Sequence, residues 1–570
     1  MQKSFLRVIT VLIAGFLWCS FAWENSEARE KAKAGFEVIE LTPGLADDLG
    51  IPSGKNGAVV WRILRGSPAE TALLQAGDLI TAVGSEKKKP TIITGMQSFT
   101  KAMDRISDSR PVTFTVIRGE KEFSVELLRS TGKFGDGIQP DPRDKPAVIT
   151  VGTGSEADFR TVEGALIRSC PHDTILLSPG KYPRVQINRD NITIRSADPK
   201  QPAILTGIDF AAVTGATAEG FHVEADVRGK GTGITGIGKQ LTVKNCKISG
   251  FNDGVSLQGT DIVIDGNYFF DQHRWAIRIG EEAEGSSIQI IRNLIKENSG
   301  GIRVSIDGKV DIHHNTIVEN RVTPKEFLER MVKNEGITGI GIAVTEAGQA
   351  EIINNVIAYN NIGCLFESNS RVTAEFNNVH QHFVEETSMP AGGSTRSIIM
   401  SANSNFVTTI RFKMVASDIV HTIIPYTPSP TNINVGPLFV DPRTGDYRLA
   451  PDSPLIGKGR GGSFIGAFPP IKSGQASAPP AFGISAQPLD QAELQEPELS
   501  GRYGLRITSV KEGSPAGEFR IAEGDIIVGI NNTPFGDMEA FRKLISSGDI
   551  KSVKVIREQK ELDLTRAVEF

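Results

Sequence analysis

Two arginines in the middle of the chain occupy the same place in two similar segments. Arg278 lies in AIRI and Arg303 lies in GIRV. Side chains alternate between the two faces of a strand, so both arginines point outward if the Ile and Val residues point inward. A guanidinium group binds carboxylates bidentately, and two such groups one strand spacing apart suit an anionic ligand such as a uronate. We therefore expect Arg278 and Arg303 to lie side by side on an exposed face.

The segment FDQHR, just before Arg278, adds groups that suit acid–base chemistry. It contains Asp271 and His273, and an Arg or His beside a carboxylate can take or give a proton. The candidate catalytic residues are therefore Arg278, Arg303, His273 and Asp271. A solvated face without chemistry remains an open alternative, in which nearby acids neutralise the arginines. Those acids are Glu281, Glu282 and Asp307.

A repeat over residues 192–380 must position these side chains. Its phrase is a β-run, an Asn, a second hydrophobic β-run, a turn, and then Gly-Ile-x-hydrophobic. Short strands with such a period cannot bury their apolar face alone, so successive turns must stack. Identical Asn side chains can then hydrogen-bond from turn to turn as a ladder. The aligned asparagines are Asn245, Asn267, Asn293, Asn315, Asn355 and Asn378.

The repeat resembles a right-handed parallel β-helix of the pectin-lyase type. The opening segment ITVGTGSEADFRTVEGALIRSCPHDTILLSPGKYP and the closing segment VGPLFVDPRTGDYRLAPDSPLIGKG resemble the ends of such helices, so the resemblance covers 148–465. In enzymes of this fold the outward face usually carries a polysaccharide groove. FDQHR is also similar to the Asp-Pro-His-acid tetrad of alginate C5-epimerases, at Asp271 and His273. The patterns of pectin methylesterases, galacturonases and calcium-dependent pectate lyases are missing.

The two ends of the chain contain one module twice, at residues 35–130 and 483–570. Each copy has a strand, a Gly-Ser-Pro-Ala turn, a short apolar helix and a Gly-Asp turn, followed by a β-rich segment, an amphipathic helix and closing strands. The Gly-Ser-Pro-Ala turns span 66–69 and 513–516, and the Gly-Asp turns lie at 77–78 and 524–525.

This order resembles the bacterial PDZ domain that accompanies trypsin-like periplasmic proteases. The protease itself is missing, since no Gly-Asn-Ser-Gly-Gly segment occurs. The resemblance implies that the C-terminus of a peptide pairs with an edge strand and that loop N–H groups hold its carboxylate. The matching positions are Gly35, Phe36, Glu37, Val38, Phe482, Gly483, Ile484 and Ser485. Modules that only dock on the middle domain or dimerise are the alternative.

Composition and the N-terminal segment narrow the functional class. The chain of 570 residues has 62 Lys+Arg against 67 Asp+Glu, which argues against nucleic acid as the main partner. Lys3 and Arg7 precede an uncharged run that ends at Trp23 and is too short to span a membrane. This pattern predicts a cleaved secretory signal and an exported protein without a transmembrane segment, located in the periplasm, at the cell surface or outside the cell. The cysteines match no zinc pattern, and we expect neither a metal nor a cofactor.

The expected fold is mostly β, with a solenoid between two small α+β modules. The expected segments are a signal peptide at 1–22, a PDZ domain at 34–130, a linker at 131–147, the β-helix at 148–465, a linker at 466–480 and a PDZ domain at 481–570. We expect an envelope scaffold whose modules capture peptide or protein C-termini and whose β-helix binds an anionic polysaccharide or another envelope component. A lyase or C5-epimerase that acts on uronate glycans is the alternative.

Overall fold

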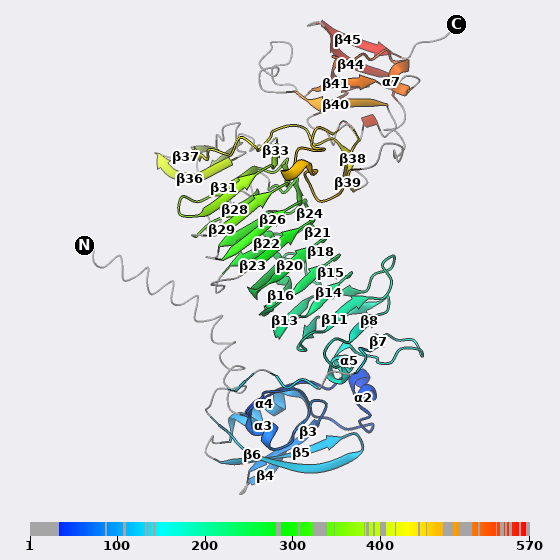
Figure 1. The fold of residues 1–570 in the computed structure, drawn as a ribbon, viewed down its shortest axis with the longest axis vertical. Coiled ribbons are helices and arrows are strands. Elements are labelled where there is room, and N and C mark those ends of the chain that lie inside the picture. The colour runs from blue at the N-terminus through cyan, green and yellow to red at the C-terminus, as the bar shows by residue number, and fades with distance from the viewer. Residues whose placement is uncertain are drawn as a thin grey trace, which may run out of the picture. The chain divides into compact units, whose positions relative to one another are not determined.

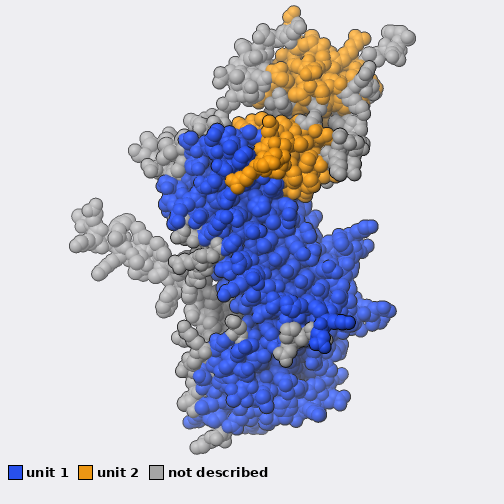
Figure 2. Space-filling model, viewed as in Figure 1, with its two compact units in different colours: residues 1–433 blue, residues 434–570 orange. Residues whose placement is uncertain are grey.

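The protein forms two compact units, residues 1–433 and 434–570 (Figure 2). The computed structural model describes residues 34–565 with the exception of the following gaps: 86–87, 107–109, 131–133, 136, 141–143, 281–286, 306–307, 323–338, 347, 381, 383–386, 392–393, 399–405, 416–417, 443–444, 452, 471–482, 490–503, 511–513, 532, 536–540, 542–543, 546–549 and 558–559. The expected signal peptide at 1–22 and most of the expected linker at 466–480 lie outside these residues.

Three parallel sheets wind along the middle of the chain as a solenoid, seen as the stacked arrows of Figure 1. Each turn contributes one strand to each sheet. Sheet I consists of β10 (Val185–Ile187), β13 (Ile208–Thr214), β16 (Thr232–Lys239), β19 (Asp253–Thr260), β22 (Trp275–Gly280), β25 (Ile302–Ser305), β28 (Ile340–Val344), β31 (Ile362–Phe366), β36 (Phe406–Val415) and β37 (Asp418–Pro425). Its last pair, β36 and β37, is antiparallel.

The other two sheets follow sheet I in every turn. Sheet II consists of β7 (Val148–Val151), β8 (Thr174–Leu177), β11 (Thr193–Ser196), β14 (Thr217–Glu219), β17 (Thr242–Lys244), β20 (Ile262–Asp265), β23 (Ser287–Ile291), β26 (Lys309–His313), β29 (Gln349–Ile353) and β32 (Arg371–Glu375). Sheet III consists of β9 (Lys181–Tyr182), β12 (Ile204–Leu205), β15 (His222–Glu224), β18 (Lys247–Ser249), β21 (Tyr268–Phe270), β24 (Leu294–Lys296), β27 (Thr316–Val318), β30 (Val356–Ala358) and β33 (Asn378–His380).

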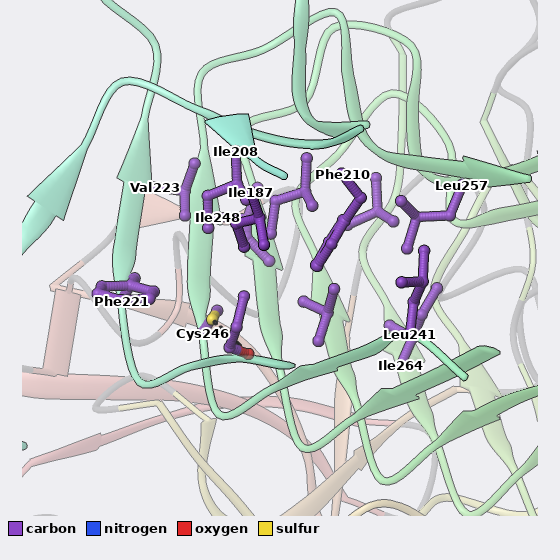
Figure 3. Close-up of a cluster of buried hydrophobic side chains, with 14 of the residues drawn as sticks. Ile187, Ile208, Phe210, Phe221, Val223, Leu241, Cys246, Ile248, Leu257 and Ile264 are labelled. Atoms are coloured by element: carbon purple, nitrogen blue, oxygen red, sulfur yellow. Dashed lines mark hydrogen bonds between the residues drawn. The ribbon is translucent and has the colours of Figure 1, made fainter. Parts of the chain in front are cut away.

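The inward positions of the strands form one continuous apolar core. Ile264, Ile290 and Ile312 are register partners in successive turns of sheet II, and all three are fully buried. Figure 3 shows how such side chains from neighbouring turns meet inside the solenoid, with Phe210 and Phe221 among them. Period-2 alternation of β-branched residues therefore explains why these segments form stacked strands.

The first module is a six-stranded antiparallel sheet with the order β1-β2-β3-β5-β6, and β4 pairs with β3. Its elements are β1 (Phe36–Glu40), α2 (Pro43–Leu49), β2 (Ala58–Ile63), α3 (Pro68–Thr71), β3 (Leu79–Ser85), β4 (Lys88–Ile92), α4 (Met96–Asp104), β5 (Pro111–Arg118) and β6 (Lys121–Leu128). One face of the sheet carries the module's own core, where the rings of Phe36 and Phe114 lie 5.6 Å apart.

The opposite face of the first module packs on the solenoid. Val59, Trp61 and Leu79 belong to the same buried cluster as the first solenoid turns. Asp48 of α2 accepts hydrogen bonds from the N–H and the hydroxyl of Thr161, the residue that caps α5 (Val162–Arg168). The first module and the solenoid therefore share one hydrophobic core.

The segment 131–147, expected to be a linker, contacts both neighbours. Gly137 forms a bridge with Leu64, and the N–H of Ile138 donates to the carbonyl of Ile63 at 2.7 Å. The buried Arg189 of the solenoid donates to the carbonyl of Ile138 at 3.3 Å. These contacts tie the described part of the segment to the module and to the solenoid.

The second unit contains a short hairpin and the second module. The hairpin strands are β38 (Phe439–Asp441) and β39 (Asp446–Leu449). The module repeats the strand order of the first, β40-β41-β42-β44-β45, with β43 paired to β42. Its described elements are β40 (Ile484–Pro488), β41 (Leu505–Val510), α7 (Pro515–Glu518), β42 (Ile526–Ile530), β43 (Thr533–Pro534), β44 (Ser552–Arg557) and β45 (Lys560–Thr565).

The expected fold class is confirmed: a mostly β chain with a parallel solenoid and a small β-rich domain at the C-terminal end. Among the described residues, no helix is both long enough and apolar enough to cross a bilayer.

Candidate functional site

Arg278 and Arg303 lie side by side on the outward face of sheet I. They are register partners in β22 and β25, between the buried pairs Ile277–Ile302 and Ile279–Val304. Both guanidinium groups are partly exposed, at 36% and 24% of the side chain. The column continues toward the first turns through Ser256, Thr235 and Asp209. Two cations therefore adjoin a row of smaller polar side chains.

Asp253 is the acid beside this pair. Its Oδ2 lies 3.4 Å from Nε of Arg278 and 3.9 Å from a terminal nitrogen of Arg274, and its Oδ1 accepts the N–H of Trp275 at 3.3 Å. Burial raises the pKa of Asp253, although Arg274, Arg278 and Arg303 oppose that shift. A buried carboxyl with a raised pKa, in contact with a partly exposed arginine, suits proton transfer or ligand orientation.

Arg303 has a separate partner on a neighbouring turn. One of its terminal nitrogens donates to Oε1 of Glu346 at 2.9 Å, and the Glu346 side chain is 64% exposed. The acids expected to neutralise the pair, Glu281, Glu282 and Asp307, lie outside the described residues. The partners found here are thus Asp253, inside the fold, and Glu346, at its surface.

Asp271 and His273 lie in a turn and not on the strand that carries Arg278. Asp271 has left-handed backbone with φ of 58° and pairs with the exposed Arg228. The N–H of His273 donates to the carbonyl of Phe251 at 2.8 Å. Gln272, between them, is buried and points into the solenoid. The turn therefore presents Asp271 beside an arginine of a different loop.

A ladder of amide side chains runs along the turn between sheets II and III. The side-chain N–H of Asn293 donates to Oδ1 of Asn315 at 3.0 Å. The same kind of bond links each of the remaining neighbouring pairs in the ladder. The ladder contains Asn267, Asn293, Asn315, Asn355, Asn377 and Asn432. Four of the expected asparagines are thus brought together in one buried column.

Two of the expected ladder positions are wrong by one residue. Asn245 is exposed with φ of 55°, and the buried Cys246 takes its place, because the N–H of Cys246 donates to Oδ1 of Asn267 at 2.9 Å. Asn378 lies in β33, and Asn377 holds the ladder position. At the first position Asn245 is the left-handed residue just before the ladder residue, a place that Asn also suits. At the second, the left-handed residue is Phe376, and Asn377 and Asn378 follow it as two consecutive asparagines, of which only Asn377 holds the ladder position.

Sequence reasoning missed a second ladder on the turn between sheets III and I. Asn298 donates to Oδ1 of Asn320 at 2.9 Å, and Asn320 donates to Oδ1 of Asn360 at the same distance. Gln272 precedes them and receives the N–H of Phe251 on its Oε1. Each of these amides comes five residues after an amide of the first ladder, which is the signal that could have found them.

The peptide-binding positions expected in the two modules occupy equivalent places. β1 and β40 each lie at an edge of their sheets, and each has a bulge after its second residue, at Glu37/Val38 and at Ser485/Ala486. Phe36 is buried in the module core, whereas Val38 and Ile484 are half-buried. Phe482 and the side chain of Ser485 lie outside the described residues.

The glycine before each edge strand is held in the same way. Gly35 has φ of 76° and Gly483 has φ of 79°, so both need the left-handed region. A Cβ on Gly35 would lie 2.0 Å from Cβ of Ser67, and one on Gly483 would lie 2.1 Å from Cβ of Ser514. The Gly-Ser-Pro-Ala turn of each module therefore packs directly beneath the loop that leads into its edge strand.

The Gly-Asp turns also match between the modules. Asp78 is buried and forms a two-bond ion pair with Arg118 at 2.6 and 2.8 Å. Asp525 forms the same pair with Arg557 at 2.6 and 2.7 Å. The two copies thus agree in strand order, bulge, glycine loop and buried ion pair.

No group of three or more His, Cys, Asp or Glu residues suited to a metal ion occurs in the described ranges. Half-buried His313 and His314 contact each other through Nδ1 at 3.2 Å, and burial lowers the pKa of both imidazoles.

Comparison with known proteins bears on two parts of the chain. Residues 232–409 match the family model of the right-handed beta helix region, and residues 506–557 match that of the PDZ domain. No curated protein matches the sequence. Among solved structures, a pectate lyase, Pel9A, is 14% identical with a TM-score of 0.37. The match covers 58% of this chain and 98% of the Pel9A chain. A pectin methylesterase from Aspergillus niger is 13% identical with a TM-score of 0.18, covering 42% of this chain and 85% of its own. The chain therefore contains a right-handed β-helix region and, near its C-terminal end, a PDZ domain.

Proposed function

We propose that this protein is an exported scaffold of the cell envelope. In this proposal both end modules are PDZ domains that capture peptide C-termini, and the β-helix binds a polysaccharide or another envelope component. The observation that carries the proposal is the edge strand of each module, preceded by a left-handed glycine. An edge strand offers unpaired N–H and C=O groups, and an extended peptide can add to it as a further strand.

The geometry of the glycine loop supports capture of a free carboxylate. Gly483 has no side chain to cover the loop, and its carbonyl accepts a hydrogen bond from the hydroxyl of Ser514 at 3.4 Å. A loop held from below in this way can direct backbone N–H groups toward a carboxylate at the end of the edge strand. In the first module Gly35 packs on Ser67 in the same way, and its carbonyl accepts the N–H of Leu64 at 2.8 Å.

A peptide-binding assay with the mature chain tests the PDZ part of the proposal. A pool of peptides with free C-terminal carboxylates and apolar last residues serves as the probe, and the same peptides with amidated ends serve as the comparison. We expect the free carboxylates to bind at least tenfold more tightly. Equal binding of the two forms, or binding of neither, contradicts the proposed mode.

Two glycine variants separate a binding defect from a folding defect. We expect Gly483→Ala to weaken binding because the new Cβ collides with Ser514. Gly524→Ala is the matched control, since Gly524 also has positive φ, in the same module, but a Cβ there meets nothing within 4 Å. An equal loss of peptide affinity in the two variants would show that backbone strain, and not the collision in the glycine loop, causes the loss. The melting temperature of the β-helix should be the same in both variants as in the wild type.

Export is tested separately. The N-terminal segment predicts cleavage after Ala22 or Ala28, so the mass of the protein recovered from the envelope should lack that segment. Recovery of the full-length chain from the cytoplasm contradicts this part of the proposal.

A second candidate function is a lyase or C5-epimerase for uronate glycans. It is favoured by the contact of Arg278 with the buried Asp253, whose raised pKa suits proton transfer. Polyuronates incubated with the protein should then give an unsaturated product, seen as new ultraviolet absorbance, or a changed epimer ratio by NMR. Arg278→Ala should abolish this turnover if the site is catalytic, and should reduce only retention on the glycan if the site is a binding face.

A further inference from the structure

The last turns of the solenoid contain a pocket of about 670 Å³ whose lining includes neither Arg278 nor Arg303. It lies over three neighbouring strands of sheet II, β26, β29 and β32, and extends to the turn 366–370 and to Tyr426. Its volume is in the range of small-molecule sites, roughly 300–1,000 Å³. Neither family match nor the arginine face explains this pocket.

The sequence explains why the pocket exists. Sheet II ends at β32, and the chain that returns there bonds to it through Thr431 and Asn432, after the strandless segment Thr427-Pro428-Ser429-Pro430. Proline has no N–H to donate, so two prolines in four residues disfavour pairing of this segment as a further strand. Val372 of β32 is consequently half-exposed, although its register partners Ala350 and Val310 are buried. The missing strand leaves an open space beside Val372.

An aromatic wall closes one side of this space. Tyr426 packs edge-to-face against Phe366 with ring centroids 5.1 Å apart, and it also contacts Phe406 at 6.2 Å. Tyr426 and Phe366 both line the pocket. Because the three rings pack against one another, the orientation of Tyr426 is restricted before a ligand binds. This lowers the conformational entropy that the side chain loses on binding.

The polar lining comes from two outward columns of sheet II. Lys309, Gln349 and Arg371 are register partners, and Glu351 pairs with Thr373 in the next column. Lys309 lies 3.1 Å from Asp311 and 3.4 Å from Glu351, so its charge is balanced within the protein. The lining thus offers fixed donors and acceptors in a regular array without a net excess of cations.

We propose that this pocket binds a neutral saccharide. Sugar hydroxyls donate and accept at the same time, as an array of Lys, Gln, Arg, Glu and Thr groups requires, and the apolar C–H face of a sugar ring packs on an aromatic side chain. A polyanion would instead meet Glu351 and Glu367 within the same lining. The inference gives the β-helix a second ligand class, distinct from the anions that suit Arg278 and Arg303.

Calorimetric titration of the full chain with neutral oligosaccharides tests the proposal. The probes are hexamers of glucose, xylose and N-acetylglucosamine, and hexagalacturonate is the charged comparison. We expect at least one neutral hexamer to bind. If no neutral hexamer binds, or if hexagalacturonate displaces the bound neutral hexamer and binds more tightly, the proposal is wrong.

Three variants assign the binding to the pocket. Gln349→Ala should lower the affinity at least tenfold, and Thr373→Arg, at an exposed position, should block the space without disturbing the core. Gln289→Ala is the matched control, because Gln289 is exposed on the same sheet but outside the pocket. Unchanged binding in Gln349→Ala and Thr373→Arg overturns the proposal.

Arg278→Ala keeps this inference separate from the proposed function. It should leave neutral saccharide binding intact while it affects uronates. Loss of peptide capture or of uronate binding would leave the result at the pocket unaltered, so the two proposals fail independently.

Discussion

The indole N–H of Trp61 in the first module donates to Oε1 of Gln186 in the solenoid at 2.8 Å. Gln186 begins the outward column of sheet I that continues, through register partners, to Arg278 and Arg303. The first module therefore stands at the end of the face that carries the arginine pair. It closes that end of the solenoid with a shared apolar core.

Replacing the docking residues should release the first module from the solenoid. The equivalents of Val59 and Trp61 in the second module are Arg506 and Thr508, so the double variant Val59→Arg with Trp61→Thr copies the second module's surface. Loss of a buried Trp costs about 3–5 kcal/mol. Denaturant unfolding should change from one transition for module and solenoid to two.

The matched control for this release is Thr508→Ala in the second module, at an exposed site. This variant should leave the number and the midpoints of the denaturant unfolding transitions unchanged. A single, unshifted transition in the double variant would show that the shared cluster does not stabilise the docked module.

Removing one rung of the first ladder should destabilise the solenoid. Asn315→Ala leaves Asn293 without its acceptor and Asn355 without one of its donors in a buried column. Each unsatisfied buried group costs about 1–3 kcal/mol, so we expect a loss of about 3 kcal/mol in the free energy of unfolding. Asn245→Gly is the control, because Asn245 is exposed and glycine accepts its positive φ. A loss of equal size in the control would place Asn245 in the ladder after all.

The charge state of Asp253 should make stability depend on pH. Its folded-state pKa is raised, mainly by burial, so the folded state holds the proton at a pH where the unfolded state has lost it. This contribution to stability is present at low pH and is lost as the pH rises through the raised pKa. The stability of the wild type relative to Asp253→Asn should therefore fall as the pH rises from the unfolded-state pKa to the raised folded-state pKa. Parallel curves for the two proteins across that window would contradict the assignment.

The buried ion pair of the first module should contribute more to the free energy of unfolding than an exposed ion pair does. Arg118→Met leaves Asp78, which is 1% exposed, without its two charged hydrogen bonds, and breaking a buried pair costs about 3–5 kcal/mol. The Arg118 side chain is 36% exposed, so solvent screening should reduce that loss to about 2 kcal/mol. Lys55→Met breaks the exposed pair with Glu122 and should change stability by less than about 1 kcal/mol. Chemical denaturation of the two variants measures this difference directly.

The repeat in the sequence was enough to predict the solenoid and most of the first ladder. Apolar residues at every second position and an Asn near each turn require stacked strands, because no single turn buries its own apolar side. Asn267, Asn293, Asn315 and Asn355 followed from that pattern. The adjacency of Arg278 and Arg303 also followed, since each lies between two inward residues of equivalent strands.

Local patterns cannot separate two neighbouring turn positions of similar chemistry. Asn245 is a left-handed residue one position before Cys246, which holds the ladder position. Asn378 is the second of two consecutive asparagines, and the first, Asn377, holds the ladder position. The difference depends on which side chain points into the solenoid, and that direction is set by the turns above and below.

The amino-acid sequence by itself determined the order of the modules, the stacking of the turns and the side of the strand on which the arginines lie. Only the tertiary structure decided which polar side chains meet: Asp253 with Arg278, Asp271 with Arg228, and Trp61 with Gln186. The reason is physical. Strand alternation and turn chemistry act over a few residues, whereas these contacts join segments that come together only when the solenoid closes and the first module packs on it.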